Sequence, residues 1–180
     1  VPGRPNVVGA FVSAPENAQL KFCDAFLIKS GNSTDLTMFL SRMPTGLLSL
    51  AMIISVWLWV SGYIGSWARA GAVASLALNP NILANGALTT NDLHLAAAAW
   101  LLFVATFNMI KDPKTSRYIW FGLAIGLVLI AKFSGVFFIA VAAVAGLIGL
   151  ITKKIGAKKI IIAVLLSMIF AISLTWASYM

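Results

Sequence analysis

Charged residues are scarce in this sequence, and cysteine is nearly absent. Only 10% of the 180 residues are charged and 61% are hydrophobic, whereas a typical soluble domain has about 25% charged and about 45–50% apolar residues. The apolar residues also come in long runs, which a water-soluble core cannot absorb. Cys23 is the single cysteine, which excludes an internal disulfide framework and a cysteine-based metal cluster. The composition therefore predicts an integral membrane protein.

Acidic residues are the rarer charged type, with 5 Asp plus Glu against 13 Lys plus Arg and a formal net charge of +8. A basic chain can bind nucleic acid, but such a protein needs a solvated basic face with aromatic side chains for stacking. Most basic residues here flank hydrophobic runs. Membrane topology explains them better, and we expect no nucleic-acid partner.

The two ends of the sequence lack the marks of natural termini. It begins Val1-Pro2-Gly3 without an initiating Met and stops at Met180 directly after an apolar run. No signal-peptide pattern opens it. We therefore interpret the chain as a fragment of a longer protein. Residues 1–43 are predicted to belong to a non-cytoplasmic loop with one or two short helices, and residues 44–180 to form the transmembrane region.

Six apolar blocks follow one another along the transmembrane region. They are, approximately, Pro44–Ile64, Ala70–Ala84, Leu93–Ile110, Tyr118–Ala131, Gly135–Ile151 and Ile160–Tyr179. A spanning helix needs about 20 apolar residues, with a range of about 17–25, and the second and fourth blocks are shorter. The pattern predicts an all-α fold, a polytopic transmembrane helix bundle with about six spans.

The basic residues predict how this bundle is oriented. Lys and Arg in short loops mark the cytoplasmic side, and eight basic residues follow the first, third and fifth blocks: Arg69, Lys111, Lys114, Arg117, Lys153, Lys154, Lys158 and Lys159. The other side carries Arg4, Lys21, Lys29, Arg42 and Lys132, together with four of the five acids. The leading segment and the turn at residues 85–92 are therefore expected outside the cytoplasm.

Four ionisable residues lie close to the predicted non-cytoplasmic interface: Arg42, Asp92, His94 and Lys132. Ionisable groups near a bilayer are costly and by default indicate function. Each also has a structural interpretation, because Arg42 and Lys132 could extend toward water, Asp92 could cap a helix, and His94 could simply be hydrogen-bonded. Taken together, the cations and helix N-termini suit a phosphate or pyrophosphate ligand. An aspartate could orient sugar hydroxyls or act as a base.

The stretch before Asp92 is rich in asparagine. Asn79-Pro80-Asn81 and Asn85-Gly86 are typical of turns and predict irregular backbone that either lines a wet cavity or forms an ordinary loop. His94 has no His or Cys partner at metal-binding spacing, so no metal ligand is predicted. The tryptophans suit interfacial belts and helix packing, and the Gly122/Gly126 pair suits close helix contact.

Three motifs in order resemble the protein O-mannosyltransferase family and its bacterial relatives, including the aminoarabinose transferases. They are Ser41-Arg42-Met43-Pro44, then the stretch from Leu78 to Leu93, which contains Asn85 and Thr89-Thr90-Asn91-Asp92, then Gly122 to Leu127 with Ala131-Lys132-Phe133-Ser134. The match covers about residues 40–150. It departs from the family at Asn85, where many relatives have histidine, and at Asn91, which interrupts a threonine-threonine-aspartate run.

The resemblance implies an inverting, multi-spanning hexosyl- or pentosyltransferase of the C superfamily. Its donor would be a polyprenyl- or dolichyl-phosphate sugar, with a lipid or protein acceptor and membrane lipids as further partners. Arg42 and Lys132 would hold the donor phosphate and Asp92 would shape the site. With Asn85 and His94 they form the predicted substrate-binding set. No cofactor is implied firmly, and a divalent metal stays open. The catalytic acid is expected upstream of Val1, because Glu16, Asp24 and Asp35 lack the family's acidic motif.

Two other functions remain open from the residues alone. A transporter or flippase for lipid-linked sugar could use the same cations, although it typically shows internal repeats, and none is evident here. A non-catalytic membrane subunit could keep the charges only as anchors. In each case the protein is expected to be a multi-pass protein of a bacterial or archaeal plasma membrane, or of the endoplasmic reticulum in a eukaryote.

Overall fold

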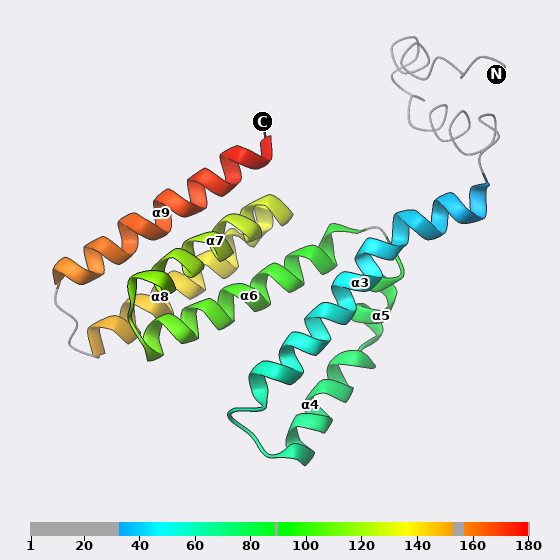
Figure 1. Ribbon diagram of the computed structural model, residues 1–180, viewed down its shortest axis with the longest axis horizontal. Helices are drawn as coiled ribbons and strands as arrows, with labels where there is room; N and C mark the ends of the chain where they lie inside the picture. Colours follow the sequence, from blue (N-terminus) through cyan, green and yellow to red (C-terminus); the bar gives the residue numbers. More distant parts are fainter. Residues whose placement is uncertain (1–32, 89, 153–156, 180) are drawn as a thin grey trace, which may run out of the picture. The chain divides into compact units, whose positions relative to one another are not determined.

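The computed structural model describes residues 33–88, 90–152 and 157–179, and within those ranges it contains helices and no strand (Figure 1). The chain divides into two units at Pro44–Thr45. Of the first unit only residues 33–44 are described. All further helix packing reported below lies within the second unit, residues 45–180.

Four of the described helical segments are long and apolar enough to cross a membrane: Thr34–Val60 (α3), Asn91–Lys111 (α6), Phe133–Thr152 (the 3-10 helix η3, Phe133–Gly135, with α8, Val136–Thr152) and Ile161–Ser178 of α9 (Ala157–Tyr179). The apolar helix α7, Thr115–Ala131, is shorter, with 17 residues. This confirms the predicted all-α membrane fold. The predicted number of six spans is approximate, because the second block does not form one long helix.

The first block begins earlier than predicted. Helix α3 starts at Thr34, so Pro44 lies inside the helix and not at its start. A proline in a helix interior removes one backbone hydrogen bond and crowds the carbonyl four residues before it, which is why the sequence favoured a helix start there. In lipid the alternative to helix is a set of unpaired peptide groups, and the helix continues through Pro44.

The second block is divided between two short helices. Helix α4 covers Ser66–Ala77, and helix α5 covers Pro80–Gly86. The break has a local cause, because the Asn79 side chain accepts a hydrogen bond from the Asn81 amide and Pro80 occupies the first turn, where its missing N–H costs nothing. The turn predicted at Asn79 is confirmed. The irregular backbone predicted onward to Gly86 is wrong, since that segment is helical.

Helix α7 is the central element of the second unit. It packs most extensively on α9 and α6, and it also contacts η3 and α8, while α8 packs on α6; Figure 1 shows the same neighbours. The largest group of buried apolar residues joins these helices and includes Leu102, Tyr118, Phe121 and Val128. The positions of both ends of α7 are therefore determined by contacts along its whole length.

Small residues bring the backbones of α7 and α9 into direct contact. A Cβ atom added to Gly122 would lie 2.5 Å from the carbonyl oxygen and 2.7 Å from the Cα of Ser167, and one added to Gly126 would lie 3.1 Å from the carbonyl oxygen of Ala171. The Ser167 hydroxyl donates a hydrogen bond of 3.1 Å to the carbonyl of Tyr118. The close packing expected from the two glycines is confirmed.

Aromatic side chains connect α3 to α6. The Trp59 ring has edge contacts with Trp100, Phe103 and Phe107 at centroid distances of 5.2–5.5 Å. The Trp100 indole donates a hydrogen bond of 2.9 Å to the Ser55 hydroxyl. These tryptophans serve helix packing, as the sequence predicts.

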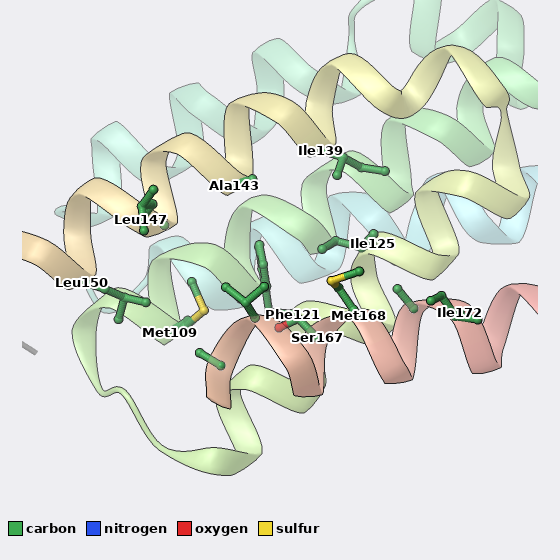
Figure 2. Close-up of a pocket in the computed structure, with 14 residues that line it drawn as sticks. Met109, Phe121, Ile125, Ile139, Ala143, Leu147, Leu150, Ser167, Met168 and Ile172 are labelled. Carbon is green, nitrogen blue, oxygen red and sulfur yellow. The ribbon is translucent and has the colours of Figure 1, made fainter. Parts of the chain in front are cut away.

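An apolar groove separates α8 from α9, with α6 and α7 behind it (Figure 2). We call it the α8–α9 groove. It has a volume of about 300 Å³, and its lining includes Met109, Phe121, Ile125, Ile139, Leu147 and Ile172. Ser167 contributes the one hydroxyl of the lining, and that hydroxyl already donates to Tyr118.

We expect Gly122→Ala to destabilise the protein by about 1–3 kcal/mol, the cost typical of overpacking. The added methyl meets Ser167 backbone atoms that cannot move aside without shifting α9. The matched control is Gly71→Ala in α4, where a Cβ atom meets nothing within 4 Å. Thermal unfolding of the purified protein in detergent measures both variants. Equal midpoints for them would contradict the tight α7–α9 contact.

Candidate functional site

The N-terminus of α6 places Asp92 at one end of the helices. Thr90 is the N-cap residue, with extended backbone, and Asp92 lies in the first turn. A carboxylate there interacts favourably with the positive end of the helix dipole. Helix α6 then runs 21 residues to Lys111, so Asp92 and Lys111 are about 28 Å apart along the helix axis.

Lys132 lies at the break between α7 and η3. Helix α7 ends at Ala131, and Lys132 has extended backbone with φ −166° and ψ 134°. The chain then turns closely against its neighbours at Gly135, because a Cβ atom there would overlap the side chains of Val128 and Leu95. The lysine predicted to occupy a break between two apolar runs does so.

Asp92 and Lys132, 40 positions apart in the sequence, form an ion pair. The Lys132 Nζ and the Asp92 Oδ1 are 2.6 Å apart, and the two side chains are 46% and 57% exposed, respectively. The lysine therefore donates to the carboxylate while remaining accessible to a ligand. The helix-cap interpretation of Asp92 covers only its place in the first turn, since its carboxylate is paired with a cation at the break between α7 and η3.

Three further polar residues connect α5 to α6 beside this pair. The Thr90 hydroxyl donates a hydrogen bond of 2.9 Å to the Asn85 side-chain oxygen. The Nδ1 of His94 lies 3.1 Å from the Thr90 carbonyl, and a carbonyl can only accept, so this contact requires the proton on Nδ1 and leaves Nε2 as the acceptor of a neutral ring. Thr90 thus links the two predicted residues Asn85 and His94. Thr90 was not among the predicted site residues, although it belongs to the Thr89-Thr90-Asn91-Asp92 motif.

Arg42 belongs to the first unit, where it is exposed on α3 two residues before Pro44. Its role in holding a ligand stays a prediction, as do those of Asn85, Asp92, His94 and Lys132. Glu16 and Asp24 lie outside the described residues, and Asp35 is exposed in the first turn of α3. Among the described residues no group of three or more His, Cys, Asp or Glu side chains is placed to hold a metal ion.

The opposite ends of the helices are basic and aromatic. Lys114 directly precedes α7, and Lys159 lies in the first turn of α9. Both line one open cavity of about 540 Å³. The Lys111 Nζ lies 3.4 Å from the Tyr63 hydroxyl. The Arg69 guanidinium lies 4.2 Å from the centre of the Trp57 ring. The structure thus places basic residues from three separate connections at the ends away from Asp92 and Lys132.

The Asp92–Lys132 pair has the chemistry of an anion-binding site. An ammonium group has three N–H donors, and only one is directed to Asp92. The others can donate to a phosphate, and the free N–H groups of the first turn of α6 favour negative charge nearby. The Asp92 carboxylate keeps a second oxygen that can accept hydrogen bonds from hydroxyl groups.

Comparison with known proteins supplies the family. A sequence model of the dolichyl-phosphate-mannose-protein mannosyltransferase family matches residues 26–176, which includes all five predicted substrate-binding residues. No curated protein and no solved structure gives a significant match. With most of the chain matched and several helices suited to a bilayer, the chain belongs to the dolichyl-phosphate-mannose-protein mannosyltransferase family and is a membrane glycosyltransferase.

Proposed function

We propose that this protein transfers a hexose or pentose from a polyprenyl- or dolichyl-phosphate donor to a lipid or protein acceptor at the non-cytoplasmic face of the membrane. The observation that carries the proposal is the exposed Asp92–Lys132 ion pair. It provides a cation for the phosphate and a carboxylate for hydroxyl groups at the same point. Arg42 is proposed as a second cation for the phosphate, and Asn85 and His94 as further contacts to the substrate.

The separation of charges supports the proposed side of the membrane. Lys111, Lys114 and Lys159 lie at the helix ends away from Asp92 and Lys132. Basic residues in short loops favour the cytoplasmic side, so we assign that side to them. The pair then faces the cell exterior or an organelle lumen, in a multi-pass protein.

In the proposed reaction an acceptor hydroxyl or amide attacks the anomeric carbon of the donor sugar. The new bond forms from the acceptor atom to the anomeric carbon while the bond from that carbon to the phosphate oxygen breaks. The acceptor proton passes to a base, a role that we assign to none of the described residues. Negative charge grows on the departing lipid phosphate, and a donor aimed at such a charge typically lowers the activation free energy by about 2.7–4 kcal/mol. Lys132 fits this role.

The α8–α9 groove suits the apolar chain of such a donor. Its lining residue Ile125 precedes Lys132 by seven positions on α7, about 10 Å along the helix. Ile139 belongs to the first turn of α8, shortly after Lys132 in the chain. A phosphate held by Lys132 would thus have an apolar path leading into the membrane nearby. This supports a lipid-linked donor over a water-soluble one.

We expect Lys132→Gln to lower the rate of sugar transfer by about 10²–10³-fold, as for the loss of one donor to a developing negative charge. The chain contains a matched control, since Lys114 also forms an exposed pair, with Asp112, at an Nζ–Oδ2 distance of 2.8 Å. Lys114→Gln is expected to keep normal activity. Transfer from a radiolabelled lipid-phosphate sugar measures both. Full activity of Lys132→Gln would refute this site.

Exchange of the two charges separates binding from folding. The double variant Asp92→Lys, Lys132→Asp retains an ion pair but moves the cation to α6. An exposed pair contributes about 0–1 kcal/mol, so we expect a nearly unchanged unfolding temperature. Transfer is expected to stay as low as in Lys132→Gln, because the phosphate would face a carboxylate. Recovery of activity in the double variant would mean that the pair has only a structural role.

A further inference from the structure

A second groove follows the contact between α6 and α7, within the second unit and separate from the α8–α9 groove. We call it the α6–α7 groove. It has a volume of about 240 Å³ and is lined by Leu101, Val104, Ala105, Asn108, Arg117, Trp120, Leu123, Ala124 and Leu127. Seven of these side chains are apolar, and none is acidic.

The two polar side chains of this groove lie at one end of it. Asn108 is three residues before the end of α6, and Arg117 is the third residue of α7. Both are partly buried. Among the described residues neither side chain has a hydrogen bond or an ion pair. A cation beside apolar helix surface normally pairs with another group, so Arg117 with Asn108 has the character of an incomplete site.

The length of the groove corresponds to one leaflet of a bilayer. From Arg117 to Leu127 the lining extends ten positions along α7, which is about 15 Å. The hydrocarbon core of a bilayer is about 30 Å thick, so about half of it lies beside the groove. Trp120 lies near the polar end of the groove and is 63% exposed. Tryptophan rings prefer the level of the lipid headgroups, so this end of the groove suits the membrane surface.

We propose that the α6–α7 groove binds an anionic glycerophospholipid of the cytoplasmic leaflet. The phosphate accepts charge-assisted hydrogen bonds from the Arg117 guanidinium and a further one from the Asn108 amide. One acyl chain lies along the apolar lining toward Leu101 and Leu127. Basic pockets between membrane helices on the cytoplasmic side are suited to such headgroups. The α6–α7 groove opens at the helix ends away from Asp92 and Lys132, so the lipid is a partner distinct from the sugar donor.

Fluorescence quenching in nanodiscs tests the proposal on the intact protein without any sugar donor. Brominated phosphatidylglycerol or brominated phosphatidylcholine is added to a phosphatidylcholine bilayer, and Trp120→Phe identifies the part of the quenching that comes from Trp120. We expect phosphatidylglycerol to quench Trp120 at a lower lipid fraction than phosphatidylcholine. Arg117→Gln should weaken this preference about tenfold, equivalent to about 1.4 kcal/mol, and Arg117→Lys should restore part of it.

Lys114→Gln is the matched control, because it removes the same charge three residues earlier and Lys114 does not line the α6–α7 groove. It should leave the preference unchanged. An equal loss in Lys114→Gln and Arg117→Gln would overturn the proposal in favour of general surface charge. Absence of quenching by either lipid would overturn it in favour of protein covering the groove. Displacement by polyprenyl phosphate but not by unlabelled phosphatidylglycerol would also overturn it. Unfolding temperatures verify that each variant is folded.

Discussion

The hydrocarbon interior of a bilayer offers no hydrogen-bond partner to an unpaired peptide group, and this constraint governs the whole structure. The described residues of the chain are almost all helical, and the backbone leaves helix at only a few points. These are the connection between α3 and α4 at residues 61–65, the turn at Asn79, where a side chain replaces a lost partner, the connections near Thr90 and Asp112, and the extended residue Lys132. Most ionisable residues in the described part of the chain therefore lie near the ends of helices, with Arg42 inside α3 as an exception.

Close contact along α7 determines how those ends meet. Gly122 and Gly126 bring α7 against α9, while α6 packs on another face of α7. Gly135 allows the chain after Lys132 to turn tightly against Val128 and Leu95. The exposed ion pair between Asp92 and Lys132 is too weak to organise these helices. The geometry of the pair is a consequence of apolar packing between the helices. Lys132 can therefore donate hydrogen bonds to a ligand without disturbing the fold.

The two ends of the helices differ in the kind of lipid chemistry that they offer. At one end Lys132 is already paired with Asp92, so the proposed donor would meet a cation for its phosphate and a carboxylate for its sugar hydroxyl groups. At the other end Arg117 has no acidic partner among the described residues and shares its groove with an amide and apolar side chains. The first arrangement suits a substrate that carries hydroxyl groups, and the second suits a lipid that remains bound.

Hydropathy and charge by themselves determined the fold class and the positions of the later membrane helices, because these depend on local transfer free energies. They did not predict the helix boundaries at Pro44 and between Ala70 and Ala84. Pro44 lies inside a helix and Pro80 follows a capping asparagine at the start of one, and these two situations look alike in sequence. Only tertiary packing decided that Asp92 meets Lys132 and that Asn108 shares a groove with Arg117. Such pairs depend on how α6 and α7 rotate against each other, and small differences in side-chain volume along the whole contact decide that rotation.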